Sequence, residues 1–306
     1  MSLDMKNILT HLHHPNSLKD YQEADEPDAI KVSEYWGRKS NRSQSPKISF
    51  ELFPPRSSTA KKSLKEVCQE LSTINPEYFS VTFGALGSSQ NDTLDTIIDL
   101  SKDTEIPITP HLTCTGIDTK QVADLVDEYI VRGIKQIMVL KGDYPKTVIK
   151  KGDFAYANEM VEFIKENYLN MDIFVAAYPE KHPHSSCVRK DIDFFVEKVN
   201  AGADKAITQY FYNIDAYFHF VDEIQKRNID IPITPGIMPI TNYDQLMHFS
   251  KICGAEIPAW ILNKLKLYKN DLNSLIEFGE DVVSEMCLKL KDNGVSNFHF
   301  YSLNKA

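Results

Sequence analysis

The length, composition and charge of the chain exclude several classes of protein. Its 306 residues, 42% of them hydrophobic and 25% charged, are typical of a globular protein with a sizeable core. The formal charge of −9, with lysines and arginines spread along the chain, argues against a nucleic-acid or anionic-membrane partner. The longest apolar runs, such as "IFVAAY", are too short to cross a bilayer.

The first 45 residues are polar and only weakly periodic. They are predicted to form an N-terminal extension, residues 1–45, partly helical or disordered. The "HLHH" stretch within it suits a solvated arm better than a metal site, and no metal is predicted. The start of the chain lacks the apolar core of a signal peptide. The five cysteines are widely spaced and form neither a CxxC pair nor a disulfide framework. Together these features predict a cytoplasmic protein.

A regular rhythm of short strand-like runs begins at residue 47. Eight runs rich in β-branched or aromatic residues lie at residues 47–53, 78–84, 108–114, 136–143, 172–179, 205–211, 231–237 and 298–303. Amphipathic helical stretches separate most of them. Strands that alternate with helices predict parallel βαβ units, and eight such units fit a (β/α)₈ barrel better than a doubly wound sheet. The fold class is therefore α/β, with a single TIM barrel over residues 46–306.

Two irregularities mark the end of the predicted barrel. Residues 241–294, between the seventh and eighth runs, leave room for two or three extra helices. The chain then ends directly after the eighth run, where a barrel normally has a closing helix, so the extension or the extra helices are expected to cover that gap. No GxGxxG motif or P-loop follows any run, and neither a Rossmann dinucleotide site nor a P-loop is predicted.

The first run, "KISFELFPP", contains a carboxylate that needs an explanation. A carboxylate removed from water is costly unless it is paired, protonated or used. The alternation of side chains places Glu51 on the face opposite Phe50, which predicts that it points into the barrel lumen. Pro54 and Pro55 cannot donate to the ladder and end the strand just beyond it. Glu51 is thus predicted to lie near the barrel mouth, as a carboxyl group that is protonated or used; the alternative is a structural salt bridge to a lysine.

Further polar residues follow the other predicted strands, at the end where barrel active sites form. They are Thr82, His111, Lys141, Asp143, Tyr178, Glu180, His182, Gln209 and Tyr301. Each alone has an ordinary structural explanation, but their shared location predicts an active site. The absence of HExxH and GxSxG motifs disfavours a zinc or serine-nucleophile site, while a Schiff base on Lys141 stays open. The mixture suits a flat organic ligand with polar edges.

Long segments of the sequence resemble those of bacterial methylenetetrahydrofolate reductases. The similar segments include "SFELFPPR", "VTFGALGSS", "PHLTC", "LKGD", "AAYPEKHP", "AGADKAITQYF", "PGIMPI" and "FHFYSLN". This resemblance implies an FAD-dependent (β/α)₈ barrel that reduces 5,10-methylenetetrahydrofolate to 5-methyltetrahydrofolate for methionine synthesis. It implies a ping-pong reaction with NADH or NADPH, NADH being favoured, and a homo-oligomer.

The resemblance also assigns roles to residues of this chain. Glu51 corresponds to the acid that protonates the substrate at N10, and Asp143 to a carboxylate that stabilises the developing cation. The residues implied in substrate binding are Gln209, Gln245, Phe249, Tyr301 and Lys305. Those implied in FAD binding are Thr82, Phe83, Ala85, His111, Lys141, Gly142, Asp143, Tyr156, Ala157, Tyr178, His182, Asp191 and Lys198.

The chain departs from the family pattern at several positions. Lys141 and Lys305 stand where arginine is common, which keeps the charge but loses the bidentate fork. Phe83 replaces a frequent tyrosine. No large C-terminal regulatory domain is expected after the barrel, and control by S-adenosylmethionine is not expected either. Two alternatives remain at this point: another flavin barrel, such as a proline-dehydrogenase-like oxidase, and a barrel that binds flavin or folate without turnover.

Overall fold

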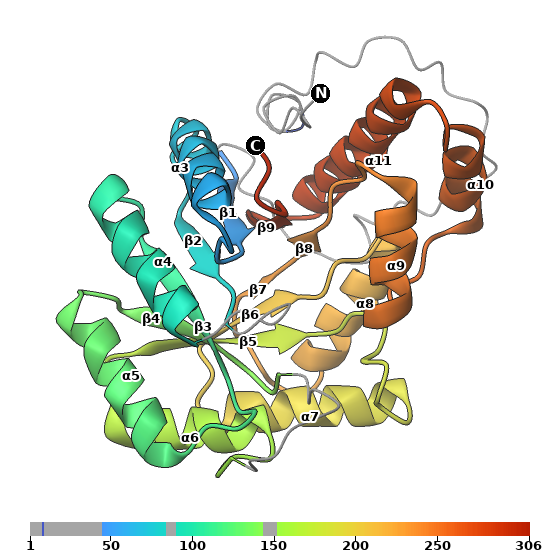
Figure 1. Cartoon of the computed structure of the whole chain (residues 1–306). Helices are drawn as coiled ribbons and strands as arrows, with labels where there is room; N and C mark the ends of the chain where they lie inside the picture. Colours follow the sequence, from blue (N-terminus) through green and yellow to red (C-terminus); the bar gives the residue numbers. More distant parts are fainter. Residues whose placement is uncertain (1–7, 9–44, 84–89, 143–151) are drawn as a thin grey trace.

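The computed structural model describes residues 8, 45–83, 90–142 and 152–306. Its strands form one parallel sheet in the order β7-β6-β5-β4-β3-β2-β1-β9-β8, with helices around the outside (Figure 1). The strands are β1 (Lys47–Leu52), β2 (Tyr78–Val81), β3 (Ile108–Thr113), β4 (Gln136–Leu140), β5 (Asp172–Ala177), β6 (Lys205–Thr208), β7 (Ile233–Thr234), β8 (Gly236–Ile237) and β9 (Asn297–Tyr301).

The sheet closes on itself through its seventh position. The predicted run 231–237 divides into β7 and β8 at Pro235, which has no N–H to give to the ladder. β7 pairs with β6, and β8 pairs with β9 in the register Gly236↔His299. The carbonyl of Pro235 still accepts a bond from the His299 N–H at 3.0 Å. The nine segments are therefore eight barrel positions, and the predicted (β/α)₈ fold is confirmed.

Helices connect successive strands and cover the outside of the barrel. They are α3 (Ser58–Ser72), α4 (Gln90–Asp103), α5 (Thr119–Val131), α6 (Ala157–Asn167), α7 (Val188–Asn200) and α8 (Ile214–Gln225). Local sequence sets their starts: the Ser57 hydroxyl accepts from the Ala60 N–H before α3, and Asp118 and Gln121 form a capping box on α5.

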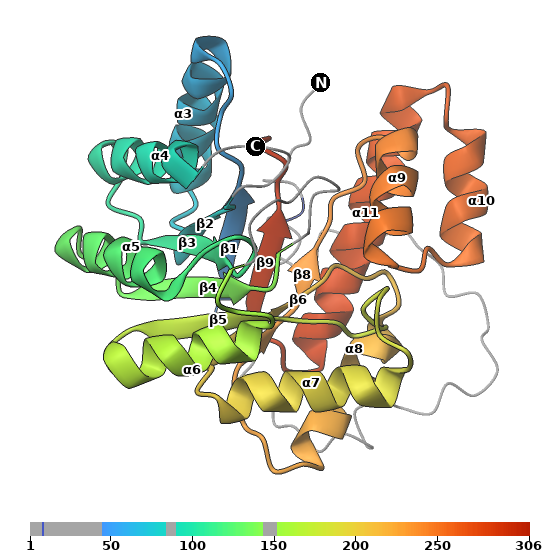
Figure 2. The same ribbon diagram turned by 60° about the horizontal axis from the view of Figure 1, so that its bottom comes forward.

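Three more helices lie between β8 and β9, in the stretch where two or three were predicted. They are α9 (Tyr243–Cys253), α10 (Ala259–Leu267) and α11 (Leu272–Asp292), and they stand together on one side of the barrel (Figure 2). No helix in the described ranges is both long and apolar enough to cross a membrane.

Successive side chains along each strand point alternately to the core beneath the helices and into the barrel lumen. Outward-facing residues such as Phe50, Phe79 and Phe300 pack in the large core beneath the helices, with Phe50 ring centroids 6.4 and 5.8 Å from the other two. Among the described residues, the lumen holds a small apolar cluster, in which the ring centroids of Tyr78 and Phe174 lie 5.4 Å apart. Polar side chains occupy much of the remaining lumen, and they build the site described below.

A short turn, and no described helix, follows β9 at the end of the chain. The Asn304 amide donates to the Phe53 carbonyl at 2.9 Å and accepts from the Phe53 N–H at 2.8 Å. The Ser302 hydroxyl donates to the Glu51 carbonyl at 2.8 Å. These three bonds tie the last turn to the end of β1 and fix the backbone that carries Glu51.

Candidate active site

Glu51 lies at the carboxyl end of β1 and faces the lumen, as its position in the alternation predicts. It pairs in register with Ser80 of β2 on one side and Tyr301 of β9 on the other. Only 13% of its side chain is exposed. The barrel therefore shelters this carboxyl group just inside its mouth.

Burial controls the charge of this carboxyl group. It raises the pKa of Glu51 from 4.5 to about 8, because the low-dielectric surroundings disfavour the anion. The nearest basic group is His111 Nε2, 3.9 Å from Glu51 Oε2, and burial lowers the pKa of His111 to about 3. Both side chains are therefore neutral at pH 7 and do not form a salt bridge. Within the described part of the chain, no lysine or arginine pairs with Glu51.

Two buried polar atoms near Glu51 lack hydrogen-bond partners among the described residues. They are Thr82 Oγ1, just after β2, and His111 Nε2 on β3. Buried polar atoms are nearly always paired in folded proteins, so each unpaired one needs an explanation. β2 and β3 are neighbouring strands, and the two atoms lie toward the same mouth, which fits a ligand with polar atoms on its edge.

The segment after β4 brings the backbone close to its neighbours. Gly142 has φ of +77°, and an added Cβ would lie 2.8 Å from Thr113 Cβ, so only glycine fits here without strain. Lys141 Nζ lies 4.8 Å above the Tyr156 ring at the start of α6, and Ala157 is the first residue of that helix. Asp143 and Ala85, two of the predicted site residues, lie outside the described residues.

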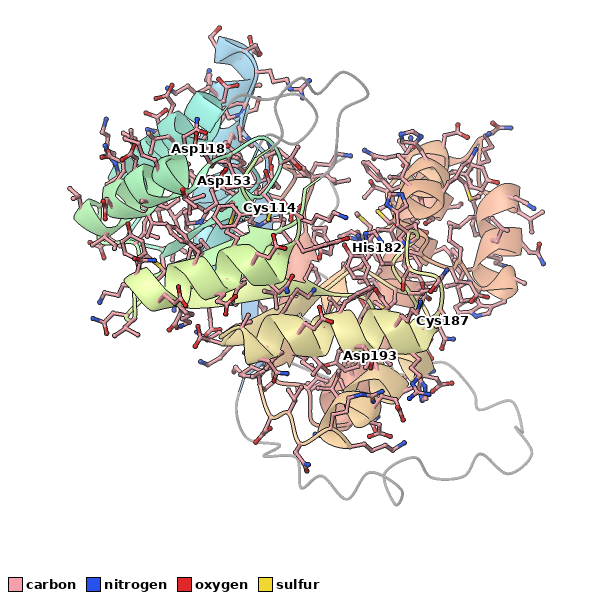
Figure 3. All side chains as sticks on the ribbon, turned by 90° about the horizontal axis from the view of Figure 1, so that it is seen from below. Cys114, Asp118, Asp153, His182, Cys187 and Asp193 are labelled. Carbon is pink, nitrogen blue, oxygen red and sulfur yellow. The ribbon has the colours of Figure 1, made fainter. Side chains whose placement is uncertain are left out.

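Thr119 and Asp153 hold the start of this α6 segment against the loop that follows β3. Asp153 Oδ2 accepts from the Thr119 N–H at 2.9 Å and from its hydroxyl at 3.1 Å. The Asp153 N–H donates to the Ile117 carbonyl at 3.0 Å. Figure 3 shows Asp118 and Asp153 near one another on this side of the molecule. The connections after β3 and β4 are thus fixed to each other.

A second group of predicted residues gathers between β5 and α7. The rings of Tyr178 and His182 meet edge to face at 4.7 Å, and Asp191 accepts from the His182 N–H at 2.9 Å. Figure 3 places His182 on the loop before α7, on the same side as Cys187. Lys198 donates to the Ala176 carbonyl, and burial lowers its pKa to about 8 although Asp191 opposes the shift. A buried amine of this kind favours the arrival of an anion, such as a phosphate.

The residues implied in substrate binding lie on several elements. Gln209 directly follows β6, and its Oε1 accepts from the Tyr210 N–H at 3.0 Å. Tyr301 donates from its hydroxyl to the Thr208 carbonyl at 2.7 Å. Gly236 makes room for this ring, because an added Cβ would lie 2.6 Å from it.

The remaining predicted substrate residues lie away from the strand ends. Gln245 and Phe249 are half-buried and one turn apart on α9, and Lys305 is exposed on the turn after β9. The structure gives no contact between these three and Glu51. The strands therefore assemble Glu51, Thr82, His111 and Tyr301 at one mouth, whereas α9 and the last turn contribute separate groups.

Sequence reasoning missed His299, a fully buried polar residue of the lumen. Its Nδ1 lies 2.8 Å from Ser49 Oγ, and its Nε2 lies 3.4 Å from Ser80 Oγ. The sequence did contain a sign of this position, because His299 and Tyr301 are two residues apart in one strand and therefore point to the same face. Within the described residues, no group of three potential ligands is placed to hold a metal ion.

Comparisons with known proteins show the family of the chain. The profile of the family described as methylenetetrahydrofolate reductase matches residues 37–306. The 5,10-methylenetetrahydrofolate reductase of Buchnera aphidicola (from Acyrthosiphon pisum) is 38% identical, over 84% of this chain and 87% of its own. The Escherichia coli protein of that name is 36% identical, over 85% and 86%.

A more distant relative and a solved structure extend the comparison. Methylenetetrahydrofolate reductase (NADH) 1 of Arabidopsis thaliana is 32% identical over 84% of this chain and 46% of its own length. A Clostridium thermocellum protein described as binding two copies of 5-methyl-5,6,7,8-tetrahydrofolic acid superposes with a TM-score of 0.63, covering 89% of this chain and 92% of its own. At 16% identity, it supports the fold alone.

Proposed function

Because the chain belongs to the methylenetetrahydrofolate reductase family, oxidoreductases that reduce methylenetetrahydrofolate to methyltetrahydrofolate, we propose that Glu51 is the acid of this reaction. The observation that carries the proposal is a carboxyl group, 13% exposed, whose pKa burial raises to about 8. Such a group retains its proton at neutral pH and can act as a general acid.

The proton has a defined task in this chemistry. The methylene bridge of the substrate must open to a 5-iminium cation before a hydride can attack it, and opening requires a proton at N10. Glu51 supplies that proton, while neutral His111 at 3.9 Å leaves it undisturbed. We further propose that Asp143, outside the described residues, stabilises the developing cation by its charge.

We propose FAD as the tightly bound, non-covalent cofactor, with NADH as its reductant. When bound, it accepts hydride from the nicotinamide and passes hydride to the folate. The unpaired Thr82 Oγ1 and His111 Nε2 support a polar-edged ring at the mouth, and the buried Lys198 beside Asp191 supports an anionic group nearer α7. The other residues in the proposed FAD site are Phe83, Ala85, Lys141, Gly142, Asp143, Tyr156, Ala157, Tyr178 and His182.

One shared site for the two substrates is the natural arrangement for a ping-pong reaction. We propose that Gln209, Gln245, Phe249, Tyr301 and Lys305 line this shared site. The name of the Arabidopsis relative, which specifies NADH, supports NADH as the reductant. We also propose a cytoplasmic homo-oligomer that serves methionine synthesis, with residues 46–306 as the catalytic unit and residues 1–45 as an extension.

Half-reaction kinetics test this function. Purified protein should show a flavin absorbance spectrum, and anaerobic NADH should bleach it. In Glu51→Gln, reduction of the flavin by NADH should persist, while oxidation of the reduced enzyme by methylenetetrahydrofolate should slow about 100-fold or more. Glu105→Gln, which alters an exposed glutamate, is the matched control and should leave both half-reactions intact.

Two results would contradict the proposal. If the protein could not be loaded with FAD, the proposal of FAD as its cofactor would be wrong. Normal folate reduction by Glu51→Gln would remove Glu51 as the acid. A protein that binds flavin but turns over neither substrate would instead match a non-catalytic barrel.

A further inference from the structure

A pocket of about 230 Å³ opens at the amino-terminal end of the barrel, opposite the mouth that holds Glu51. Its wall includes the first residues of several strands and the residues just before them, among them Lys47, Ser49, Glu77, Tyr78, Lys205 and Asn297. Ion pairs lie at its rim, Lys47 with Glu77 at 2.6 Å and Lys205 with Asp172 at 2.8 Å. A polar pocket of this size holds water.

A column of hydrogen-bonding side chains leads from this pocket into the lumen. Tyr78 and Ser49 both line the pocket, and they are register partners on neighbouring strands. Ser49 Oγ lies 2.8 Å from His299 Nδ1, and Ser80 Oγ lies 3.4 Å from His299 Nε2. His299 is fully buried and stacks on the Tyr78 ring at 5.9 Å. The imidazole thus links a hydroxyl at the pocket to a hydroxyl deeper in the barrel.

The column ends beside Glu51. Ser80 and Glu51 are register partners on adjacent strands, and both side chains face the lumen. Neighbouring strands lie about 4.8 Å apart, so the Ser80 and Glu51 side chains are neighbours in the lumen. In the structure the Ser80 hydroxyl bonds to His299 and not to Glu51, and the last transfer requires it to turn toward the carboxyl group. The polar side chains therefore run from the amino-terminal pocket to the carboxyl group at the opposite mouth.

We propose that this column is a proton inlet, through which water in the amino-terminal pocket reprotonates Glu51 by way of Ser49, His299 and Ser80. The proposal rests on the proposed role of Glu51 as the acid. That role requires one new proton per turnover, and the column gives Glu51 a route to water that does not pass through the carboxyl-terminal mouth, where the proposed cofactor and substrates bind.

Each transfer breaks one bond to hydrogen and forms another. After Glu51 gives up its proton, the Ser80 hydroxyl donates to the carboxylate and takes a proton from His299 Nε2. His299 Nδ1 takes a proton from Ser49, which is refilled from water directly or through Tyr78. The net change is one proton moved from water to Glu51, and a half-turn of the imidazole with rotation of the hydroxyls restores the start. Burial lowers the pKa of His299 to about 3, so the ring stays neutral and the transfers are concerted.

Exchange of the Glu51 proton into heavy water tests the inlet without any turnover. The carboxyl stretching band of protonated Glu51, identified by its loss in Glu51→Gln, is followed by infrared spectroscopy on flavin-loaded enzyme. Ser49→Ala and Ser80→Ala should each slow the exchange about tenfold or more, equivalent to about 1.4 kcal/mol in the barrier. Ser49→Thr, which keeps the hydroxyl, should restore fast exchange. Asn297→Ala, a pocket residue outside the column, should exchange like the wild type.

Turnover gives an independent readout. In Ser49→Ala, the first oxidation of pre-reduced enzyme by methylenetetrahydrofolate should keep its rate, since Glu51 is already protonated. Steady-state kcat should fall, with a larger solvent isotope effect. A structural defect would instead slow the first turnover as well.

The outcomes separate the inlet from the proposed function. Wild-type exchange rates in both alanine variants, or equal loss in the first and later turnovers, would overturn the inlet while Glu51 remained the acid. If Glu51→Gln itself reduced folate normally, the proposed function would fail first.

Discussion

Replacement of Glu51 by glutamine should stabilise the protein, by an amount that grows with pH. In the unfolded chain the carboxyl group ionises near 4.5, whereas in the folded barrel it ionises near 8. Between these values the unfolded state releases a proton that the folded state retains, so wild-type stability falls as pH rises. Glutamine does not ionise, so the stability of the variant does not have this pH dependence.

The size of the effect follows from the same interval. From 4.5 to about 8, at about 1.4 kcal/mol per pH unit, the full penalty is about 5 kcal/mol. Water that reaches the 13% exposed side chain and local relaxation reduce it, and we expect about 2–3 kcal/mol at pH 9. For a chain of this length that corresponds to a Tm increase of about 3–5 °C. Near pH 4.5 the increase should vanish.

Thermal and urea unfolding of the two proteins at pH 5, 7 and 9, at equal flavin content, measure this difference. The exposed Glu105→Gln variant corrects for the general loss of one negative charge. A stability gain that is the same at all three pH values would refute the reasoning, since it would show that Glu51 ionises normally in the folded state. A loss of stability at pH 9 would mean that the carboxylate has a partner.

Three further substitutions test the frame of the site. Asn304→Ala removes both side-chain bonds to the Phe53 backbone and should cost about 1–3 kcal/mol in urea unfolding; an unchanged midpoint would show that the last turn does not hold β1. Gly236→Ala places a Cβ 2.6 Å from the Tyr301 ring and should cost about 3 kcal/mol or more, unless the β8 backbone shifts, which a crystal structure would reveal. Lys198→Met should weaken flavin binding about tenfold in a fluorescence titration. Without flavin, the same variant should be more stable than the wild type below pH 8, where the buried amine carries a costly charge, and equally stable above pH 10.5. Unchanged flavin affinity would show that Lys198 is not part of the cofactor site.

The sequence predicted the barrel because its two periodicities are local properties. Runs such as 47–53 and 108–114 carry the alternation of a strand, and the stretches between them carry the helical period. It also predicted the position of Glu51, since a period of two allows only two faces and Phe50 occupies the other. The resemblance of long segments supplied the family, which the comparisons then showed.

Other features depend on contacts between residues far apart in the chain. The division of the seventh strand at Pro235 came from pairing with two different neighbours, β6 and β9. The unpaired atoms of Thr82 and His111 can be found only when every possible partner is placed. The contact of His299 with Ser49 joins residues 250 positions apart, and sequence spacing gives no sign of it.

The sequence by itself determined the elements, their order and the side of each strand that its residues face, because these follow from local backbone geometry. It therefore placed a carboxyl group in the lumen, but both a protonated acid and a salt bridge to a lysine were still possible. The tertiary structure decided the charge of Glu51, since its pKa of about 8 arises from burial among strands that only the closed barrel brings together. It also decided that a polar column lies beneath this group, because Ser49, Ser80 and His299 meet only when β1, β2 and β9 are neighbours.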